Sequence, residues 1–178
     1  KRVPGKNLCT INGIPLVTYK VLAAKQSIFC SRIIISTDSL KIAQEAERAG
    51  AEAFMRPEEL ATDTAKTEDV VRDIMDRTEP MDAIMLLEPS SPFVMPGNYD
   101  YATQMMSRYN ADFIFGHVLY LFRWAWLKGR QDLYDNLTAK TYYFDMPTSE
   151  AVDIDTPHDL EHARWLAANG YVDLSWAK

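Results

Sequence analysis

Apolar runs rich in β-branched residues alternate along this chain with segments whose apolar residues recur at helical spacing. Continuous apolar runs bounded by turn residues predict strands that are covered on both faces, at 32–37, 82–89 and 111–116. Apolar residues three or four positions apart predict helices at 38–50, 67–78, 98–109 and 156–170. This alternation is typical of an α/β fold in which a mostly parallel sheet carries helices on both faces.

Several of the predicted helices begin with capping residues. Asp38 or Ser39 is placed to cap the first helix, and Thr67 is placed to cap the second. Thr156 and Asp159 have the spacing of a capping box at the start of the last helix, which makes that helix the clearest element of the chain. No repeat, low-complexity segment or linker divides the sequence, so we expect a single domain over residues 1–178.

Composition narrows the classes of function. The chain has 178 residues, of which 47% are hydrophobic, and a net charge of −6, which argues against general binding to nucleic acid or to an anionic membrane. No apolar run approaches the length of a membrane span, and no signal-peptide pattern is present. Cys9 and Cys30 are too few for a disulfide framework, so we expect a cytoplasmic protein. An anionic ligand would therefore need a local basic site.

The stretch "KRVPGKN" is a candidate for that basic site. Lys1, Arg2 and Lys6 surround Pro4-Gly5, and glycine lets the backbone approach a ligand closely. Backbone N–H groups together with Lys and Arg make a phosphate cradle, although the P-loop pattern is absent. A solvated basic terminus explains the same residues equally simply.

Two carboxylates stand two positions apart in "VDIDT". Asp153 and Asp155 share one face of an extended segment, where they would suit Mg²⁺, which is commonly held by one or two carboxylates plus substrate phosphates. Asp155 also lies close to the start of the last helix, where it could act only through helix-end electrostatics. The segment 56–69 is polar and rich in threonine, which fits either a ligand loop or a plain connection.

Five segments together resemble one known family. "KRVPGKNL", "RIIISTDS", "RPEELATDTAKT", "LLEPSSP" and "VDIDTPHDL" occur in the order found in the acylneuraminate cytidylyltransferases, the CMP-sialic acid synthetases. The resemblance covers nearly the whole chain and implies a Rossmann-like nucleotidyltransferase fold. It also implies a reaction in which CTP and a nine-carbon 2-keto sugar acid give the CMP-sugar and pyrophosphate.

The resemblance assigns roles residue by residue. The implied catalytic residues are Arg2, Lys6, Asp153 and Asp155. The two aspartates would also hold Mg²⁺. The nucleotide would be bound by Lys1, Arg2, Lys6, Asn7, Arg56, Thr62 and Thr67. The sugar would face Glu88, Ser90 and Ser91. CTP and a nonulosonic acid are the implied ligands, and a homodimer is the implied assembly.

Three departures qualify the resemblance. The family's chains normally place a strand and a small-residue loop before this first motif, so we expect the phosphate site to be incomplete here. Glu88 replaces the usual glutamine and Val94 replaces an arginine in "LLEPSSPFV", which puts the sugar's identity in doubt. "FGHV" runs directly into "LYLFRWAWL", where relatives carry a longer stretch, so we expect residues to be missing at Val118/Leu119.

Two alternatives to a sialic acid enzyme follow from the residues. The first is a related nucleotidyltransferase that uses another sugar or nucleotide. The second is a homologue that binds a nucleotide without turnover, which the carboxylate of Glu88 beside an acidic sugar would favour because like charges repel. His117, His158 and His162 do not suggest a catalytic system, and no serine nucleophile motif appears.

Overall fold

The computed structural model describes residues 3–62, 64–128, 130 and 139–177. Its strands are β1 (Thr10–Ile11), β2 (Ile14–Pro15), β3 (Ile34–Thr37), β4 (Glu52–Met55), β5 (Ala83–Leu87), β6 (Phe113–Gly116), β7 (Leu119–Arg123) and β8 (Thr141–Tyr143). Its α-helices are α1 (Leu16–Gln26), α2 (Leu40–Ala49), α3 (Thr67–Asp76), α4 (Pro96–Tyr109), α5 (Trp124–Leu127) and α6 (Pro157–Ala168). Two short 3₁₀ turns, η1 (Lys6–Leu8) and η2 (Glu58–Leu60), complete the elements of the described residues.

The strands form three separate ladders. β1 and β2 make a small hairpin, β3 and β4 pair in parallel, and the third sheet has the order β5-β7-β6-β8. β5, β6 and β8 run in one direction, and β7 runs against both of its neighbours. The α/β prediction is confirmed, with β7 as an antiparallel member. The reason is local: β6 and β7 are joined through His117 and Val118 alone, and so short a connection permits only antiparallel pairing.

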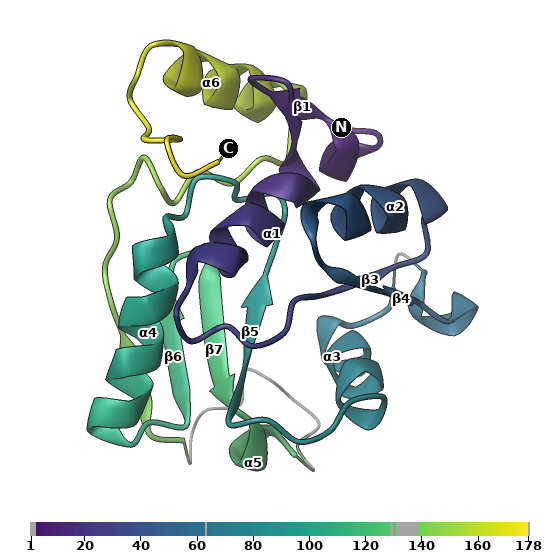
Figure 1. Cartoon of the computed structure of the whole chain (residues 1–178), viewed down its shortest axis with the longest axis vertical. Helices are drawn as coiled ribbons and strands as arrows, with labels where there is room; N and C mark the ends of the chain where they lie inside the picture. Colours follow the sequence, from purple (N-terminus) through teal and green to yellow (C-terminus); the bar gives the residue numbers. More distant parts are fainter. Residues whose placement is uncertain (1–2, 63, 129, 131–138, 178) are drawn as a thin grey trace.

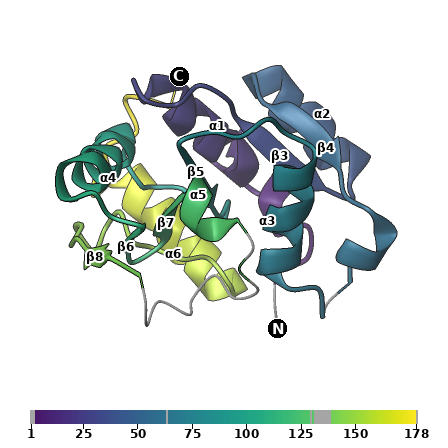
Figure 2. The ribbon, with the colours of Figure 1, turned by 90° about the horizontal axis from the view of Figure 1, so that it is seen from below.

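Helices cover both faces of the larger sheet. On one face, Ile114 and Leu121 belong to the main core with residues of α1 and α4, such as Leu16 and Met105. On the other face, Phe113, Phe122 and Ile84 pack with α3 and α5 in a second cluster, because neighbouring residues of a strand point to opposite faces. Figures 1 and 2 show α1 between α4 and α2, where it contacts both helices.

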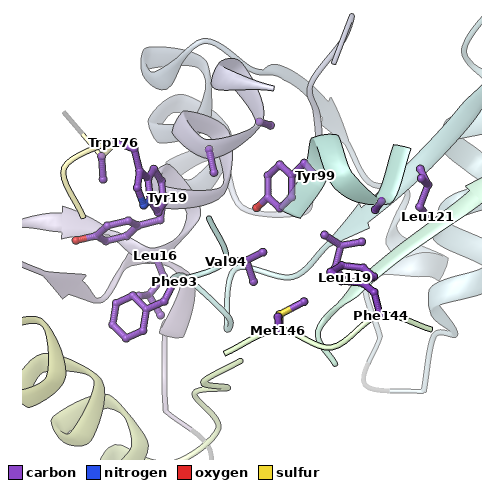
Figure 3. Packing of buried hydrophobic residues seen from close by; sticks show 14 of the residues in the cluster. Leu16, Tyr19, Phe93, Val94, Tyr99, Leu119, Leu121, Phe144, Met146 and Trp176 are labelled. Atoms are coloured by element: carbon purple, nitrogen blue, oxygen red, sulfur yellow. The ribbon is translucent and has the colours of Figure 1, made fainter. Parts of the chain in front are cut away.

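The main core is built from large apolar side chains around α1. Figure 3 shows Tyr19 beside Trp176, and their rings meet edge to face with centroids 6.0 Å apart. Tyr19 also donates a hydrogen bond from its hydroxyl to the carbonyl of Ile11, 2.8 Å away, which satisfies the buried phenol. This core packs the C-terminal segment against α1. The described helices include none with the length and apolar composition of a membrane-spanning segment.

Most helix boundaries agree with the sequence prediction. Ser39 accepts the capping hydrogen bond of α2, and Thr156 with Asp159 forms the complete capping box of α6. The prediction that Thr67 caps α3 is wrong, because Lys66 occupies the cap position and Thr67 is the first helical residue. Its hydroxyl is therefore one position too late to accept the hydrogen bond expected of a cap.

Candidate active site

A cleft of about 660 Å³ separates β3 from β5. It exists because, within the described residues, β3 pairs only with β4 and β5 only with β7. Apolar residues of both strands and of α1 form its walls, and polar residues gather where the strands end. The predicted site residues that line it are Asn7, Arg56, Thr67 and Glu88. In Figure 1, β5 ends on the side of the molecule where the N-terminus and α6 lie.

Arg56 is fixed on the β3–β4 side of the cleft. Its guanidinium donates from Nε to Oγ of Ser36 at 3.2 Å and from Nη2 to the carbonyl of Ser36 at 2.7 Å. Its backbone N–H donates to the carbonyl of Thr37 at 2.9 Å, which extends the β3–β4 pairing by one residue. The acceptors are neutral and a guanidinium has five N–H donors, so the positive charge and further donors stay available to an anionic ligand.

The threonine-rich segment 56–69 lines the cleft with Arg56, Ala65 and Thr67. Thr67, at the start of α3, lines the cleft, whereas Thr62 is not among its lining residues. The hydroxyls of Thr62 and Thr64 lie 3.3 Å apart, so they are hydrogen-bonded to one another. The structure thus brings Thr67, but not Thr62, to the other predicted residues. A ligand contact from either side chain stays a prediction.

The N-terminal basic stretch meets the acidic pair. Nζ of Lys6 donates to Oδ1 of Asp155 at 3.0 Å, although the two residues are 149 positions apart. The backbone N–H of Val3 donates to the carbonyl of Asp155, and Gly5 takes a left-handed φ of 62° at the turn before η1. Glycine accepts that conformation without strain. Lys1 and Arg2, the other predicted cations, lie outside the described residues.

The two serines of the predicted sugar turn support the acidic pair. Oγ of Ser91 donates to Oδ1 of Asp153 at 3.3 Å, and the carbonyl of Ser90 accepts the backbone N–H of Ile154 at 2.9 Å. Both serines are buried, while the carboxylates of Asp153 and Asp155 are exposed. The turn therefore holds the acidic segment at the end of β5. Direct contact of these serines with a sugar stays a prediction.

Lys20 is a site residue that the sequence prediction missed. Its side chain is 5% exposed, and its Nζ has no hydrogen-bond partner among the described residues. Burial lowers the pKa of Lys20 to about 7, because the charged form loses its hydration. The carboxylates of Glu88 and Asp153 have a smaller, opposite effect on this pKa. The available signal was a single lysine inside the apolar run "LVTYKVLAA".

Glu88 occupies the rim of the cleft at the end of β5. Desolvation is the main reason that the pKa of its carboxyl is raised, followed by repulsion from Asp153. Attraction to Lys6 and Lys20 acts in the opposite direction. Tyr120 has a raised pKa for related reasons, first burial and then the two carboxylates. The end of β5 thus gathers charges of both signs.

His117 belongs to a polar cluster that the sequence did not predict. Its Nε2 lies 2.7 Å from Oδ1 of Asp145 and 2.8 Å from the hydroxyl of Tyr143. The hydrogen bond from His117 is the main reason that the pKa of Asp145 is lowered. The cluster follows β6 and β8 at the sheet edge where β5 also ends. A sequence signal was lacking because residues 117 and 145 are brought together only by strand pairing.

The carboxylates of Asp153 and Asp155 suit a metal ion whose remaining ligands come from the substrate. Within the described part of the chain, no group of three or more His, Cys, Asp or Glu side chains is placed to hold a metal ion. Asp153 and Asp155 are two exposed carboxylates on one extended segment. Two carboxylates plus substrate phosphates are a typical set for Mg²⁺.

Comparisons with known proteins agree with the residue pattern. CMP-N,N'-diacetyllegionaminic acid synthase of Legionella pneumophila is 39% identical over 110 residues, which cover 59% of this chain and 47% of that protein. N-acylneuraminate cytidylyltransferase of Escherichia coli is 36% identical over 93 residues, covering 52% of this chain and 22% of that protein. The matched region thus spans less than half the length of either relative.

Solved structures share the fold at low sequence identity. A CMP:2-keto-3-deoxy-manno-octonic acid synthetase complexed with CTP has a TM-score of 0.76 at 17% identity and covers 96% of this chain and 94% of its own. A Mycobacterium tuberculosis protein in complex with manganese has a TM-score of 0.60 at 16% identity, over 91% of this chain and 92% of its own. The family described as cytidylyltransferase matches residues 1–164. The chain therefore belongs to the cytidylyltransferase family.

Proposed function

We propose that this chain forms the nucleotidyltransferase domain, over residues 1–178, of an enzyme that joins CTP to a nonulosonic acid and releases pyrophosphate. The relatives named for CMP-legionaminic acid synthesis and for N-acylneuraminate cytidylyl transfer support this substrate class. The proposal includes Mg²⁺ as the cofactor, a homodimer and a cytoplasmic location.

The observation that carries the proposal is the meeting of Lys6, Asp155 and the β5 turn. A cation, a pair of carboxylates and the end of a sheet strand come together from three distant parts of the chain. Phosphoryl transfer depends mainly on positioning and on neutralising charge, which are the two properties that such an arrangement supplies.

The residues divide the work as follows. Arg56 and Lys6 bind the triphosphate, and Lys6 exchanges its carboxylate partner for a phosphate oxygen when CTP enters. Asp153 and Asp155 would hold Mg²⁺, and the bound ion would supply Lewis-acid stabilisation of the charge at the α-phosphate. The anomeric hydroxyl of the sugar acid gives up its proton to water and forms a bond to the α-phosphorus. The bond between that phosphorus and the oxygen bridging to the β-phosphate breaks, and pyrophosphate leaves.

Pyrophosphate release tests the proposal. The purified chain is incubated with CTP, Mg²⁺ and one of four acids: N-acetylneuraminic, legionaminic, pseudaminic or 3-deoxy-manno-octulosonic acid. We expect release with a nonulosonic acid and none when the acid is omitted or when ATP replaces CTP. Turnover of the octulosonic acid alone would favour another sugar. Retained CTP binding by calorimetry with no turnover of any acid would favour a binding protein.

A further inference from the structure

Strand β5 is less buried than its apolar composition predicts. All the residues of Ala83–Leu87 are apolar, yet each is only partly buried. In β6, Phe113–Gly116, three of the four residues are buried. Apolar clusters cover both faces of both strands, so the difference arises at their edges. β6 pairs with β7 and β8, whereas β5 pairs only with β7 among the described residues.

Strand β3 presents a second open edge to the same cleft. Ile34–Thr37 pairs with β4 on one side, and all four of these residues line the cleft. All the residues of Ala83–Leu87 line it too, so the cleft runs along the full length of both strands. Within the described part of the chain, neither edge pairs with a further strand. Open edges present backbone N–H and C=O groups that can pair with an added strand.

The interior of the cleft is apolar on the sides of both helices that cover it. Its lining residues from α1 and α3 include Val17, Val21, Ala24, Val70, Val71 and Ile74. Polar lining residues such as Arg32, Asp38, Asp82 and Glu88 directly flank the two strands in the sequence. An apolar interior between two sheet edges suits a strand that is covered on both faces, because such a strand is apolar along its whole length.

The size of the cleft matches a strand as long as its neighbours. Strands lie about 4.8 Å apart, packed layers lie about 10 Å apart and each residue advances about 3.3 Å, so one residue of a covered strand fills about 160 Å³. The cleft of about 660 Å³ therefore has room for about four residues. That is the length of β3.

Two buried donors that line the cleft lack acceptors. Nζ of Lys20 and the hydroxyl of Tyr99 are buried and have no hydrogen-bond partner among the described residues. Buried polar groups in folded proteins are normally hydrogen-bonded, so both donors indicate an occupant that brings acceptors with it. A peptide brings such acceptors in its backbone carbonyls, which a purely apolar ligand lacks.

We propose that this cleft is a strand slot, in which an extended apolar peptide docks between β3 and β5, pairs with the open edges of both, and joins the β3–β4 ladder to the larger sheet. Main-chain hydrogen bonds supply affinity in this mode of recognition. The peptide needs about four consecutive apolar residues and no proline, because both of its faces are covered and its N–H groups must donate. The inference goes beyond the proposed function and leaves it intact, since Lys6 and Arg56 lie outside the two strands.

Hydrogen–deuterium exchange on the full chain, read by mass spectrometry, tests the slot. The probe is a synthetic peptide with the sequence of residues 82–88, which form a strand that is itself covered on both faces. We expect the peptide to slow backbone exchange at least about tenfold in both Ile34–Thr37 and Ala83–Leu87, because N–H groups at both open edges gain partners. Exchange in β6 should not change, because both of its edges are already paired.

A peptide of the same length that carries Met85→Pro is the matched control. Proline has no N–H to donate and is excluded from central strands, so this peptide should leave exchange unchanged. Protection of only one of the two strands, or equal protection by the proline peptide, would overturn the inference. Faster exchange in Ala83–Leu87 would also overturn it, because the peptide would then have displaced β5. The test needs no turnover, so its result stands whether or not the chain releases pyrophosphate.

Discussion

The charged side chains on the two walls of the cleft have different kinds of partner. On the β3–β4 wall, the guanidinium of Arg56 is bound by neutral oxygens of Ser36. At the end of β5, the ammonium of Lys6 is bound by the carboxylate of Asp155, and Glu88 and Lys20 line the same cleft. The neutral partners hold the Arg56 guanidinium in place and leave its positive charge unpaired. At the end of β5, by contrast, positive and negative side chains partly neutralise one another.

This difference separates the jobs that the walls are suited to perform. A positive group with neutral partners is ready for an anion such as a phosphate, and its position does not change when the anion binds. A cluster of opposed charges responds to a new charge, because a bound cation or phosphate alters the balance among its members. We therefore expect changes at the β5 end to affect turnover most and changes at Arg56 to affect nucleotide affinity.

The largest effect is expected from removing the acidic pair. Asp153→Asn together with Asp155→Asn should lower kcat at least about 100-fold, because the carboxylates that hold the metal beside the α-phosphate are lost. Pyrophosphate release at saturating Mg²⁺ measures this. Asp76→Asn, at the end of α3 and outside the cleft lining, is the matched control. A wild-type kcat in this double variant would contradict the proposal that the two aspartates hold the metal.

A smaller effect, of a different kind, is expected on the opposite wall. Arg56→Lys should raise the KM for CTP about tenfold and change kcat by less than about twofold, because a lysine cannot make the two guanidinium contacts to Ser36 and still present donors to phosphate. Arg48→Lys, an exposed change on α2, controls for loss of a guanidinium. A fall in kcat with an unchanged KM would show that the walls do not divide the work in this way.

The smallest effect is expected at the capping box, which holds the segment carrying Asp155. Thr156→Ala should lower the free energy of unfolding by about 1 kcal/mol, because α6 loses its capping hydrogen bond. Urea denaturation at neutral pH measures the change. Stability within the error of wild type would mean that the box adds little, despite its geometry.

The same box gives the unfolding free energy a pH dependence. Hydrogen bonds from the backbone N–H groups of Thr156 and then Asp155 hold the pKa of Asp159 below its ordinary 3.8. The stability from this ion is therefore fully present above that value and is lost as the pH falls through the lower, folded-state pKa. Asp159→Ala should show a shallower decline of stability below about pH 4 than wild type does. Parallel declines would contradict this role for Asp159.

Local patterns predicted the elements with clear boundaries and missed those without them. The strands β3, β5 and β6 and the capping box of α6 were predicted because apolar runs and capping residues act over a few positions. Helix α1 was not predicted from its sequence. Most of its residues are buried, on more than one side of the helix, so its apolar residues do not form the single stripe that marks an amphipathic helix. Strand β4 was also missed. It is short and partly exposed, so apolar and polar residues do not alternate clearly along it.

The prediction that residues are missing near Val118 stays untested. The structure joins β6 to β7 by a tight turn in which His117 takes a φ of 46°, a left-handed value that non-glycine residues adopt less readily. This turn also brings His117 to Asp145 and Tyr143. The cluster depends on the parallel pairing of β6 with β8, which no local pattern revealed.

Local patterns in the sequence were enough to predict the α/β class, the capping of α6 and the chemical types at the site: the basic turn at Lys6, the acidic pair and Glu88. Those features follow from spacing and composition within short windows. Packing of distant segments brings Lys6 to Asp155 and Ser91 to Asp153, and it places the buried Lys20 in the same cleft as Glu88. Electrostatic partners are set by distance in space and by desolvation, and a linear sequence specifies neither until the chain has packed.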